Sequence, residues 1–169
     1  MRTMLAVLVV ALAAGVAGST ASDSRVIRGD EWIGSFAVKK NGKLGGALAA
    51  FGAPSSTTRG DGSCRVRWNR LGLQISFYNL GGQDACGRTT GFFQSATING
   101  RGWRTVQGLR IGDAGARVRR LFPSAERHGN RWWLVPRFTQ ATGRYPGLSA
   151  GVNGGKVTDF RVVYGAGGE

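Results

Sequence analysis

Arginine residues surround a tryptophan in the stretch "RVRWNR", where they could bind an anionic ligand. Guanidinium groups pair with phosphate or carboxylate, and flat rings stack on bases or sugars, as in grooves for single-stranded nucleic acid and sugar polymers. On a strand, however, Arg65 and Arg67 share one face and Trp68 lies on the other. The charges and the ring therefore do not form one surface. Arg65, Arg67 and Arg70 remain candidate anion-binding residues.

A second aromatic stretch, "RWWLVPRF", contains two adjacent tryptophans. Neighbouring residues of a strand point to opposite faces. One of Trp132 and Trp133 should therefore belong to the core. The other is either covered by a helix or loop or forms an exposed platform for a ligand, so both are candidate platform residues.

Three further candidate anion-binding residues, Arg117, Arg119 and Arg120, lie in "GLRIGDAGARVRRLF". This stretch predicts a short helix with Asp113 at its N-cap and Pro123 beyond its end. At about 100° per residue the apolar side chains share one arc and the arginines lie beside or opposite it. The arrangement suits the outer face of a core helix, and an anion site would need these arginines to meet others in space. The apolar arc comprises Ala114, Val118, Leu121 and Phe122.

Two short motifs resemble catalytic signatures but lack their context. "GLSAG" matches the nucleophile elbow of hydrolases, which needs a strand before the serine and a helix after it. Here Pro146 precedes the motif, a turn follows Ser149, and the single histidine, His128, comes before the serine rather than after it. "GGKVT" lacks the hydroxyl residue that follows the lysine of a phosphate loop and has Ala150 in place of its first glycine. We therefore predict no catalytic residue from these motifs.

Acid–base chemistry and metal binding are also weakly supported. Asp30, Glu31, Asp84 and Asp159 are the mid-chain carboxylates that could work in pairs, but nothing in the sequence brings two of them to the spacing of a glycosidase. One histidine in a polar turn and two cysteines do not make a metal site. We expect no metal and no cofactor.

Alternating and helical patterns predict a mixed α+β fold with short helices packed on an antiparallel sheet. Residues 31–38 read as a first strand, and "KLGGALAAFGAPS" reads as an amphipathic helix that ends at a glycine. Residues 64–79 alternate as a hairpin. Residues 91–108 predict another hairpin, with Asn99-Gly100 as its turn. "NRWWLVPRF" reads as a strand, and "LSAGVNGGKVTDFRVVYG" as two strands joined by a turn.

The start of the chain has the order of a secretory signal peptide, with a basic residue, an apolar run and then small residues. We predict a signal peptide over 1–21, export by the general secretory route and no membrane span afterwards. A loose leader over 22–30 and a single domain over 31–169 should follow. In an oxidising compartment Cys64 and Cys86 should form a disulfide, the alternative being two free buried thiols.

The chain of 169 residues is strongly basic, with 23 Lys and Arg against 9 Asp and Glu and a net charge of +14. This balance favours acidic partners, but it also fits a genome rich in arginine and glycine codons. Export makes nucleic acid an improbable physiological ligand. An anionic cell-envelope polymer or an acidic protein is the expected partner.

The two halves of the chain echo each other. Leu44, Leu48 and Phe51 align with Ala114, Val118 and Leu121, which predicts half-modules over 31–98 and 99–169. The stretches "LRIGDAGARVRRLFPSA" and "LGGALAAFGAPS" resemble the helix-plus-sheet modules of the outer-membrane assembly lipoprotein family and the tandem modules of the beta-lactamase inhibitor protein family, both of them bacterial. The lipid-attachment cysteine of the lipoproteins is missing. The resemblance implies protein binding and carries over no functional residue.

These observations favour a secreted, basic binding or envelope-associated module rather than an enzyme. Two alternatives stay open: a protein inhibitor of an extracellular enzyme, as the resemblance implies, and a small hydrolase acting on an anionic polymer.

Overall fold

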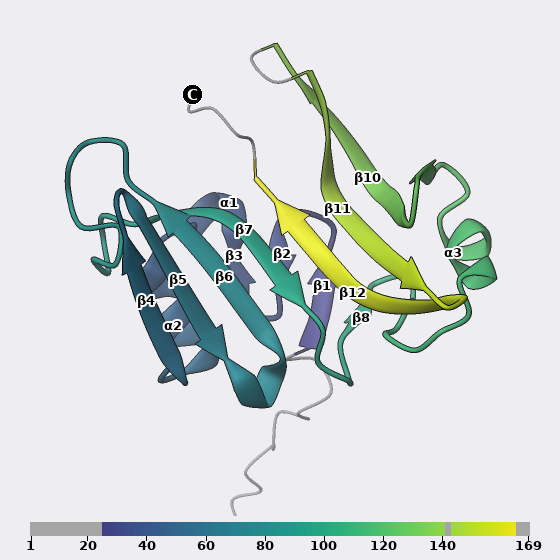
Figure 1. The fold of residues 1–169 in the computed structure, drawn as a ribbon, viewed down its shortest axis with the longest axis horizontal. Helices are drawn as coiled ribbons and strands as arrows, with labels where there is room; N and C mark the ends of the chain where they lie inside the picture. The colour runs from purple at the N-terminus through teal and green to yellow at the C-terminus, as the bar shows by residue number, and fades with distance from the viewer. Residues whose placement is uncertain (1–24, 141–142, 165–169) are drawn as a thin grey trace, which may run out of the picture.

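The computed structural model describes residues 25–140 and 143–164, so the predicted signal peptide over 1–21 lies outside the described residues. Its main layer is an eight-stranded sheet in which every neighbouring pair is antiparallel (Figure 1). In spatial order the strands are β4 (Ser56–Gly60), β5 (Ser63–Trp68), β6 (Leu73–Tyr78), β7 (Phe92–Ile98), β12 (Lys156–Val163), β11 (Gly143–Asn153), β10 (Arg131–Thr139) and β9 (Glu126–His128).

The sheet is built from two meanders of four consecutive strands, each preceded by a helix. Helix α2 (Leu44–Phe51) comes before β4 to β7, and helix α3 (Ala116–Leu121) comes before β9 to β12. The last strands of the two meanders, β7 and β12, pair at the centre of the sheet. The two parts thus share one topology, as the hypothesis of half-modules requires, while descent from a duplicated ancestor stays a prediction.

A smaller, four-stranded sheet and the N-terminal helices lie behind the main sheet (Figure 1). In this small sheet β1 pairs with β2 antiparallel and with β8 in parallel. In the part of the chain that the structure describes, no helix is long and apolar enough to cross a membrane. The elements of this layer are β1 (Val26–Arg28), β2 (Trp32–Ile33), β3 (Phe36–Ala37), β8 (Arg104–Thr105) and α1 (Val38–Asn41), while a short 3-10 turn, η2 (Asn69–Leu71), links β5 to β6.

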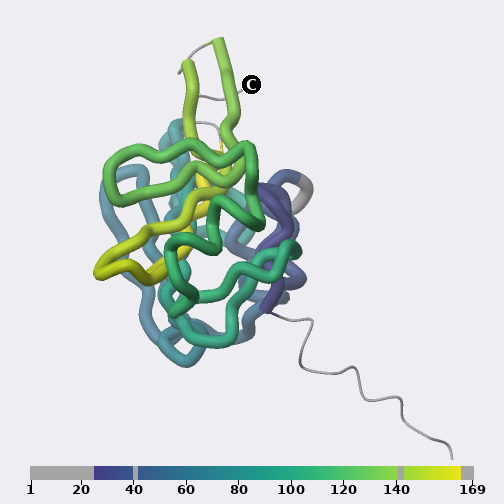
Figure 2. The backbone as a smooth tube through the Cα atoms, turned by 90° about the vertical axis from the view of Figure 1, so that its right-hand side faces the viewer, coloured from purple at the N-terminus to yellow at the C-terminus, as the bar shows by residue number. Residues whose placement is uncertain are grey.

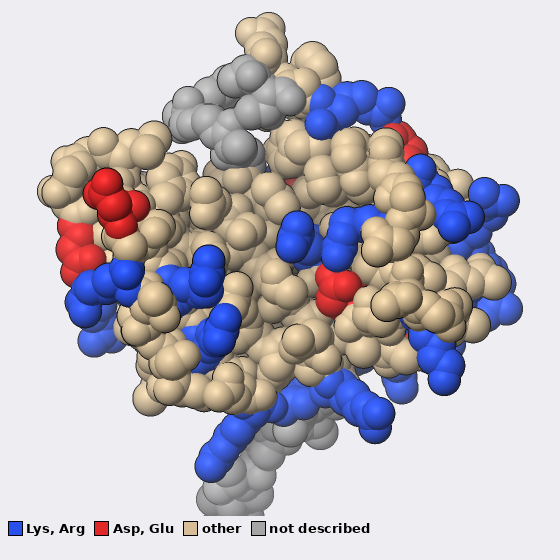
Figure 3. Space-filling view, viewed as in Figure 1, with Lys and Arg blue, Asp and Glu red and all other residues tan. Residues whose placement is uncertain are grey.

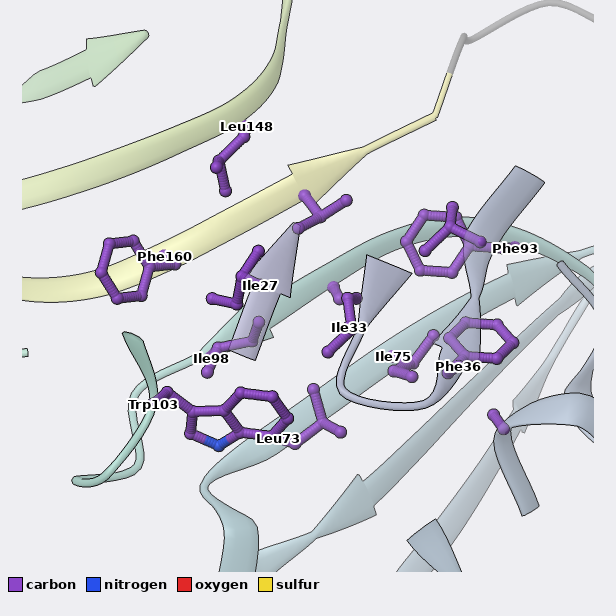
Figure 4. Packing of buried hydrophobic residues seen from close by; sticks show 14 of the residues in the cluster. Ile27, Ile33, Phe36, Leu73, Ile75, Phe93, Ile98, Trp103, Leu148 and Phe160 are labelled. Atoms are coloured by element: carbon purple, nitrogen blue, oxygen red, sulfur yellow. The ribbon is translucent and has the colours of Figure 1, made fainter. Parts of the chain in front are cut away.

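The core lies between the two sheets (Figure 4). Alternation buries every second residue of the central strands, so that Ile75 and Ile98 of the main sheet face Ile27 and Ile33 of the small one. Trp103 is fully buried among them, and its indole Nε1 donates a hydrogen bond to the carbonyl of Leu71 at 2.8 Å. The small sheet therefore covers one face of the large sheet and leaves the other to solvent.

Several predicted elements are confirmed. The structure has the α+β class, helix α2, the β5–β6 and β11–β12 hairpins, strand β10 and the Cys64–Cys86 disulfide. Cys64, Val66 and Trp68 are buried as the alternation predicted, and Arg65 and Arg67 are exposed.

Two predictions about the N-terminal region are wrong. Residues 31–38 form two short strands rather than one, because the chain turns at Gly34, where φ is +58°. Part of the predicted leader is structured: Val26 and Ile27 in β1 and Asp30 after it are buried. These residues enter the fold because their strand pairs with both β2 and β8.

Asn99-Gly100 does not form the predicted hairpin turn. The backbone N–H groups of both residues donate to the carbonyl of Gly72, and the chain then leaves the main sheet for β8. The approach is so close that a Cβ on Gly100 would lie 2.0 Å from the carbonyl oxygen of Leu71. Strand β7 pairs instead with β6 and with β12, which is distant in sequence.

The second predicted helix begins later than expected. Asp113 is not its N-cap, because residues 112–115 form hydrogen bonds with β12 and the turn before it, and Gly115 takes the cap position. The Asp113 carboxylate accepts a hydrogen bond from the backbone N–H of Arg110 at 2.8 Å. Ala114 is consequently exposed and outside the helix, whereas Val118 is buried.

The disulfide should contribute measurably to stability. It joins residues 22 positions apart, and closing such a loop in the unfolded chain corresponds to about 3 kcal/mol. We expect the double variant Cys64→Ser/Cys86→Ser to lose about that much free energy of unfolding in a denaturant titration. A reductant should destabilise the native protein but not the variant, and equal stability of the variant and the disulfide-bonded native protein would contradict this account.

Candidate functional site

The solvent-facing side of the eight-stranded sheet, here called the open face, carries several basic residues. Because side chains alternate along a strand, Arg65 and Arg67 point away from the core that contains Cys64 and Val66. Figure 1 shows α1, α2 and the small sheet behind the main sheet, so these described elements do not cover the open face. In Figure 3 basic groups appear over the β5 side and over the middle of this face.

Strand register places the open-face residues of both halves in one row. Arg67 lies opposite Gln74, and their side chains are hydrogen-bonded at 2.7 Å. Gln74 pairs with Thr97, and Thr97 pairs with Arg161 of β12. Arg67 and Arg161 are thus three strand spacings apart, about 14 Å.

Arg161 also belongs to this surface, although it was not among the residues predicted from the sequence. The alternation in "DFRVV" would have placed it opposite the buried Phe160 and Val162. Its proximity to β7 could not be read from the sequence, because the β7–β12 pairing joins segments about sixty residues apart.

Arg131 also belongs to the open face, but its charge is compensated. One guanidinium nitrogen donates to Asp159 at 2.7 Å, and another donates to the hydroxyl of Ser149 at 3.3 Å. Gly151 makes room for this pair, since a Cβ there would lie 2.0 Å from an Asp159 carboxylate oxygen. Among the described residues of the face, Arg65, Arg67 and Arg161 form no ion pair with a carboxylate, and Arg67 is bonded only to the neutral Gln74 amide.

The two candidate platform tryptophans point to opposite sides of β10, as predicted. Trp133 lies in the open-face row, opposite Ser149 and Glu126. Its ring stacks on His128 with 3.9 Å between centroids, so His128 is an edge-strand residue rather than the expected loop residue. Trp132 faces the core side, where the guanidinium of Arg119 lies 5.6 Å from its ring centroid.

The other candidate arginines do not join the open-face row. Arg70 lies in η2, beyond the end of β5. Arg117 forms an ion pair with Asp113 at 3.4 Å, while Arg119 and Arg120 are exposed in the last turn of α3. The six predicted anion-binding residues therefore fall into separate groups in space.

The "GLSAG" motif is structural in this fold. Ser149 is fully buried in the middle of β11, with no turn from strand to helix, and its hydroxyl oxygen accepts the hydrogen bond from Arg131. This setting exposes no hydroxyl nucleophile at Ser149. Across the described ranges, no group of three His, Cys, Asp or Glu residues could hold a metal ion.

Asp30 is the most deeply buried of the candidate carboxylates. Burial alone would raise its pKa, but two hydrogen bonds from Arg137, at 2.7 and 2.9 Å, and the nearby charge of Lys39 lower the pKa below its usual value. Gly147 lies against this pair, where a Cβ would meet Asp30 Oδ2 at 2.6 Å. The bridge ties the turn after β1 to β10, 107 residues later, and it keeps Asp30 ionised rather than able to donate a proton.

The remaining candidate carboxylates also have cationic partners. The backbone N–H of Cys86 lowers the pKa of Asp84, and Arg59 acts in the same direction. Glu31 accepts a hydrogen bond from Lys39 at 3.0 Å. These carboxylates neutralise basic residues, and their arrangement does not suggest a general acid.

The fold and its surface define a small α+β protein with two packed sheets and an uncovered basic sheet face. No protein-family model matches the chain, and comparisons with curated proteins and with solved structures gave no match. Its function is therefore argued from the geometry of its surfaces.

The Asp30–Arg137 bridge should make stability depend on pH. The pKa of Asp30 is lower in the folded protein than in the unfolded chain. Its contribution to the free energy of unfolding is therefore complete above the unfolded pKa of about 3.9, and it is lost as the pH falls through the folded pKa. We expect Asp30→Asn to reduce the free energy of unfolding by about 2 kcal/mol at pH 7. Denaturant titrations should show this difference shrinking below about pH 4.

Asp61→Asn is the matched control, since Asp61 is an exposed carboxylate in the turn between β4 and β5. It should change the free energy of unfolding little at pH 7 and at pH 2.5. If Asp30→Asn lost the same free energy of unfolding at pH 2.5 as at pH 7, the ion pair would not stabilise the fold.

Proposed function

We propose that this protein is an exported, non-catalytic binding protein that docks an acidic protein surface on its open face. The observation that carries the proposal is the group of exposed arginines, Arg65, Arg67 and Arg161, on a broad sheet face left uncovered by α1, α2 and the small sheet. The net charge of +14 supports an acidic partner and electrostatic steering toward it.

The dimensions of the open face suit a protein partner. Eight strands at about 4.8 Å spacing span roughly 34 Å, and six residues along a strand span roughly 20 Å. The resulting area is close to the roughly 800 Å² that each partner contributes to a standard protein interface. A broad sheet face fits another protein better than it fits a single polymer chain, which would need a groove.

The composition of the open face also supports protein docking. Arginine and tryptophan are enriched among residues that dominate binding energy. Trp133 is half-buried and stacked on His128, so its ring is already held in place before a partner arrives. Short polar side chains between the arginines leave space for a partner's acidic groups. They are Ser76, Ser95 and Thr97.

Inhibition of an extracellular enzyme is a second candidate that uses the same face. The observation in its favour is the continuous eight-stranded sheet made from two helix-plus-meander parts, together with the resemblance to the beta-lactamase inhibitor protein family. An inhibitory complex should persist at high salt, whereas docking that depends mainly on exposed charges should weaken.

Retention on isolated bacterial cell envelope would test the proposed partner. Three samples of envelope would be compared: untreated, stripped of anionic polymers and digested with protease. We expect retention to fall as salt rises, to survive polymer removal and to disappear after protease treatment. The double variant Arg67→Glu/Arg161→Glu should need at least about tenfold more envelope for half retention, because both substitutions place a negative charge opposite an acidic surface.

The variant Arg101→Glu/Arg120→Glu is the matched control, because it makes the same charge change in a turn and on α3, away from the open-face row. It should be retained nearly as well as the unmodified protein. Retention that survives protease but not polymer removal would overturn the protein partner in favour of an envelope polymer. Equal losses in the two double variants would show that net charge, rather than the open face, causes retention.

A further inference from the structure

A hollow of about 810 Å³ lies at the α3 end of the molecule, away from the open-face row. Figure 2 looks onto this end, where α3, the β9–β10 turn and the β11–β12 turn come together. Trp132 lines the hollow from β10, and Arg119 and Arg127 line it from α3 and β9. The other lining residues are Gly115, Ala116, Gly129, Asn130, Val152 and Gly155.

Two arginines are neighbours of the same tryptophan in this hollow. Arg127 pairs with Trp132 in the β9–β10 register, which puts their Cβ atoms about 5 Å apart on one side of the sheet. Arg119 reaches the Trp132 ring from the helix, with its guanidinium carbon 5.6 Å from the centroid. The ring therefore positions Arg119 by a cation–π contact, and the two arginines line the same hollow from different elements.

The described residues that line the hollow include no carboxylate to neutralise its two arginines. No aspartate or glutamate is among the described lining residues, and none of the ion pairs within the described ranges involves Arg119 or Arg127. Arg127 donates from its Nε to the carbonyl of Gly129 at 3.1 Å, which orients its guanidinium and leaves the terminal nitrogens to bind a ligand. Two oriented guanidiniums in a shared hollow are suited to bidentate binding of an oxyanion.

The size of the hollow indicates a ligand larger than an isolated anion. Its volume falls in the range of small-molecule sites, about 300–1,000 Å³. The Asn130 amide and the turn backbone can bind hydroxyl groups, while Val152 and the edge of Trp132 offer apolar contact. We propose that this hollow binds a small polar molecule, of the class of a sugar, that carries a phosphate or carboxylate held by Arg119 and Arg127.

The proposal is independent of docking on the open face. Trp132 and Trp133 point to opposite sides of β10, so a ligand at the Trp132 hollow does not contact the Trp133 surface. Either site can fail its test without affecting the other.

Isothermal titration calorimetry with four probes would test the hollow: glucose 6-phosphate, glucuronate, glucose and inorganic phosphate. We expect at least one of the two anionic sugars to bind, and glucose to show no binding. Binding of glucose 6-phosphate alone would identify a phosphate site, and binding of glucuronate alone a carboxylate site. Inorganic phosphate should bind at least about tenfold more weakly than the preferred sugar, because it cannot contact the rest of the hollow.

Single substitutions would locate the binding. Arg119→Gln and Arg127→Gln should each weaken the preferred sugar at least about tenfold, since each removes a charge-assisted hydrogen-bond donor. Arg120→Gln removes the same charge from the neighbouring position of α3, which does not line the hollow, and should bind normally. The two glutamine variants lie on different elements, so a folding defect in one, detected by its thermal unfolding, leaves the other as the test.

Three outcomes would overturn the proposal. The first is the absence of binding by both anionic sugars at millimolar concentration. The second is an equal loss of affinity in Arg120→Gln, which would indicate non-specific attraction to a basic surface. The third is inorganic phosphate binding as tightly as the sugars, which would reduce the hollow to a bare anion site.

Discussion

The pairing of β7 with β12 is the interaction on which the rest of this structure depends. It joins the last strands of two meanders, with Ile98 opposite Phe160 and Ala96 opposite Val162. All four side chains are buried, so the same contact that continues the hydrogen-bonded ladder also joins the two halves of the core. Without this pairing each meander would expose an edge strand and half of its apolar face.

One consequence of the joined sheet is that its two faces have different environments. The small sheet and α2 cover the inner face with apolar side chains, and the bridge from the buried Asp30 to Arg137 connects the turn after β1 to β10 of the main sheet. The outer face keeps the polar and basic members of each alternating strand. The two tryptophans of β10 follow this division, because Trp133 contributes to the open face and Trp132 to the hollow beneath α3.

The few acidic residues are distributed so that they neutralise some basic residues and not others. Asp30, Asp84 and Asp159 each form an ion pair with an arginine that lies far away in the sequence or on another strand. Part of the surplus positive charge lies on the open face and around the α3 hollow. A net charge computed from composition predicts an acidic partner, but it does not reveal these two locations, because charge pairing depends on which strands lie side by side.

Local patterns in the sequence determined the fold class and much of the secondary structure. Alternation placed Arg65 and Arg67 opposite Cys64 and Val66, helical spacing ending at a glycine located α2, and two cysteines indicated the disulfide. These features depend on neighbours within a few residues, or on there being just one cysteine pair. The arginines of α3 were likewise recognised as the outer face of a helix, although the start of that helix was placed too early.

Tertiary structure alone decided which arginines of different elements share a surface. Asn99-Gly100 is a sequence that favours a hairpin turn, yet the chain there packs against Gly72 and continues to the small sheet. The pairing of β7 with β12 and the burial of Trp103 involve more of the molecule than a local hairpin would, and they determine this path. Arg127 and Arg119 line the same hollow as Trp132 for the same reason: β9 pairs with β10, and α3 lies at the end of the sheet. Sequence patterns record the periodicity of single elements, whereas a binding surface is formed by contacts between elements.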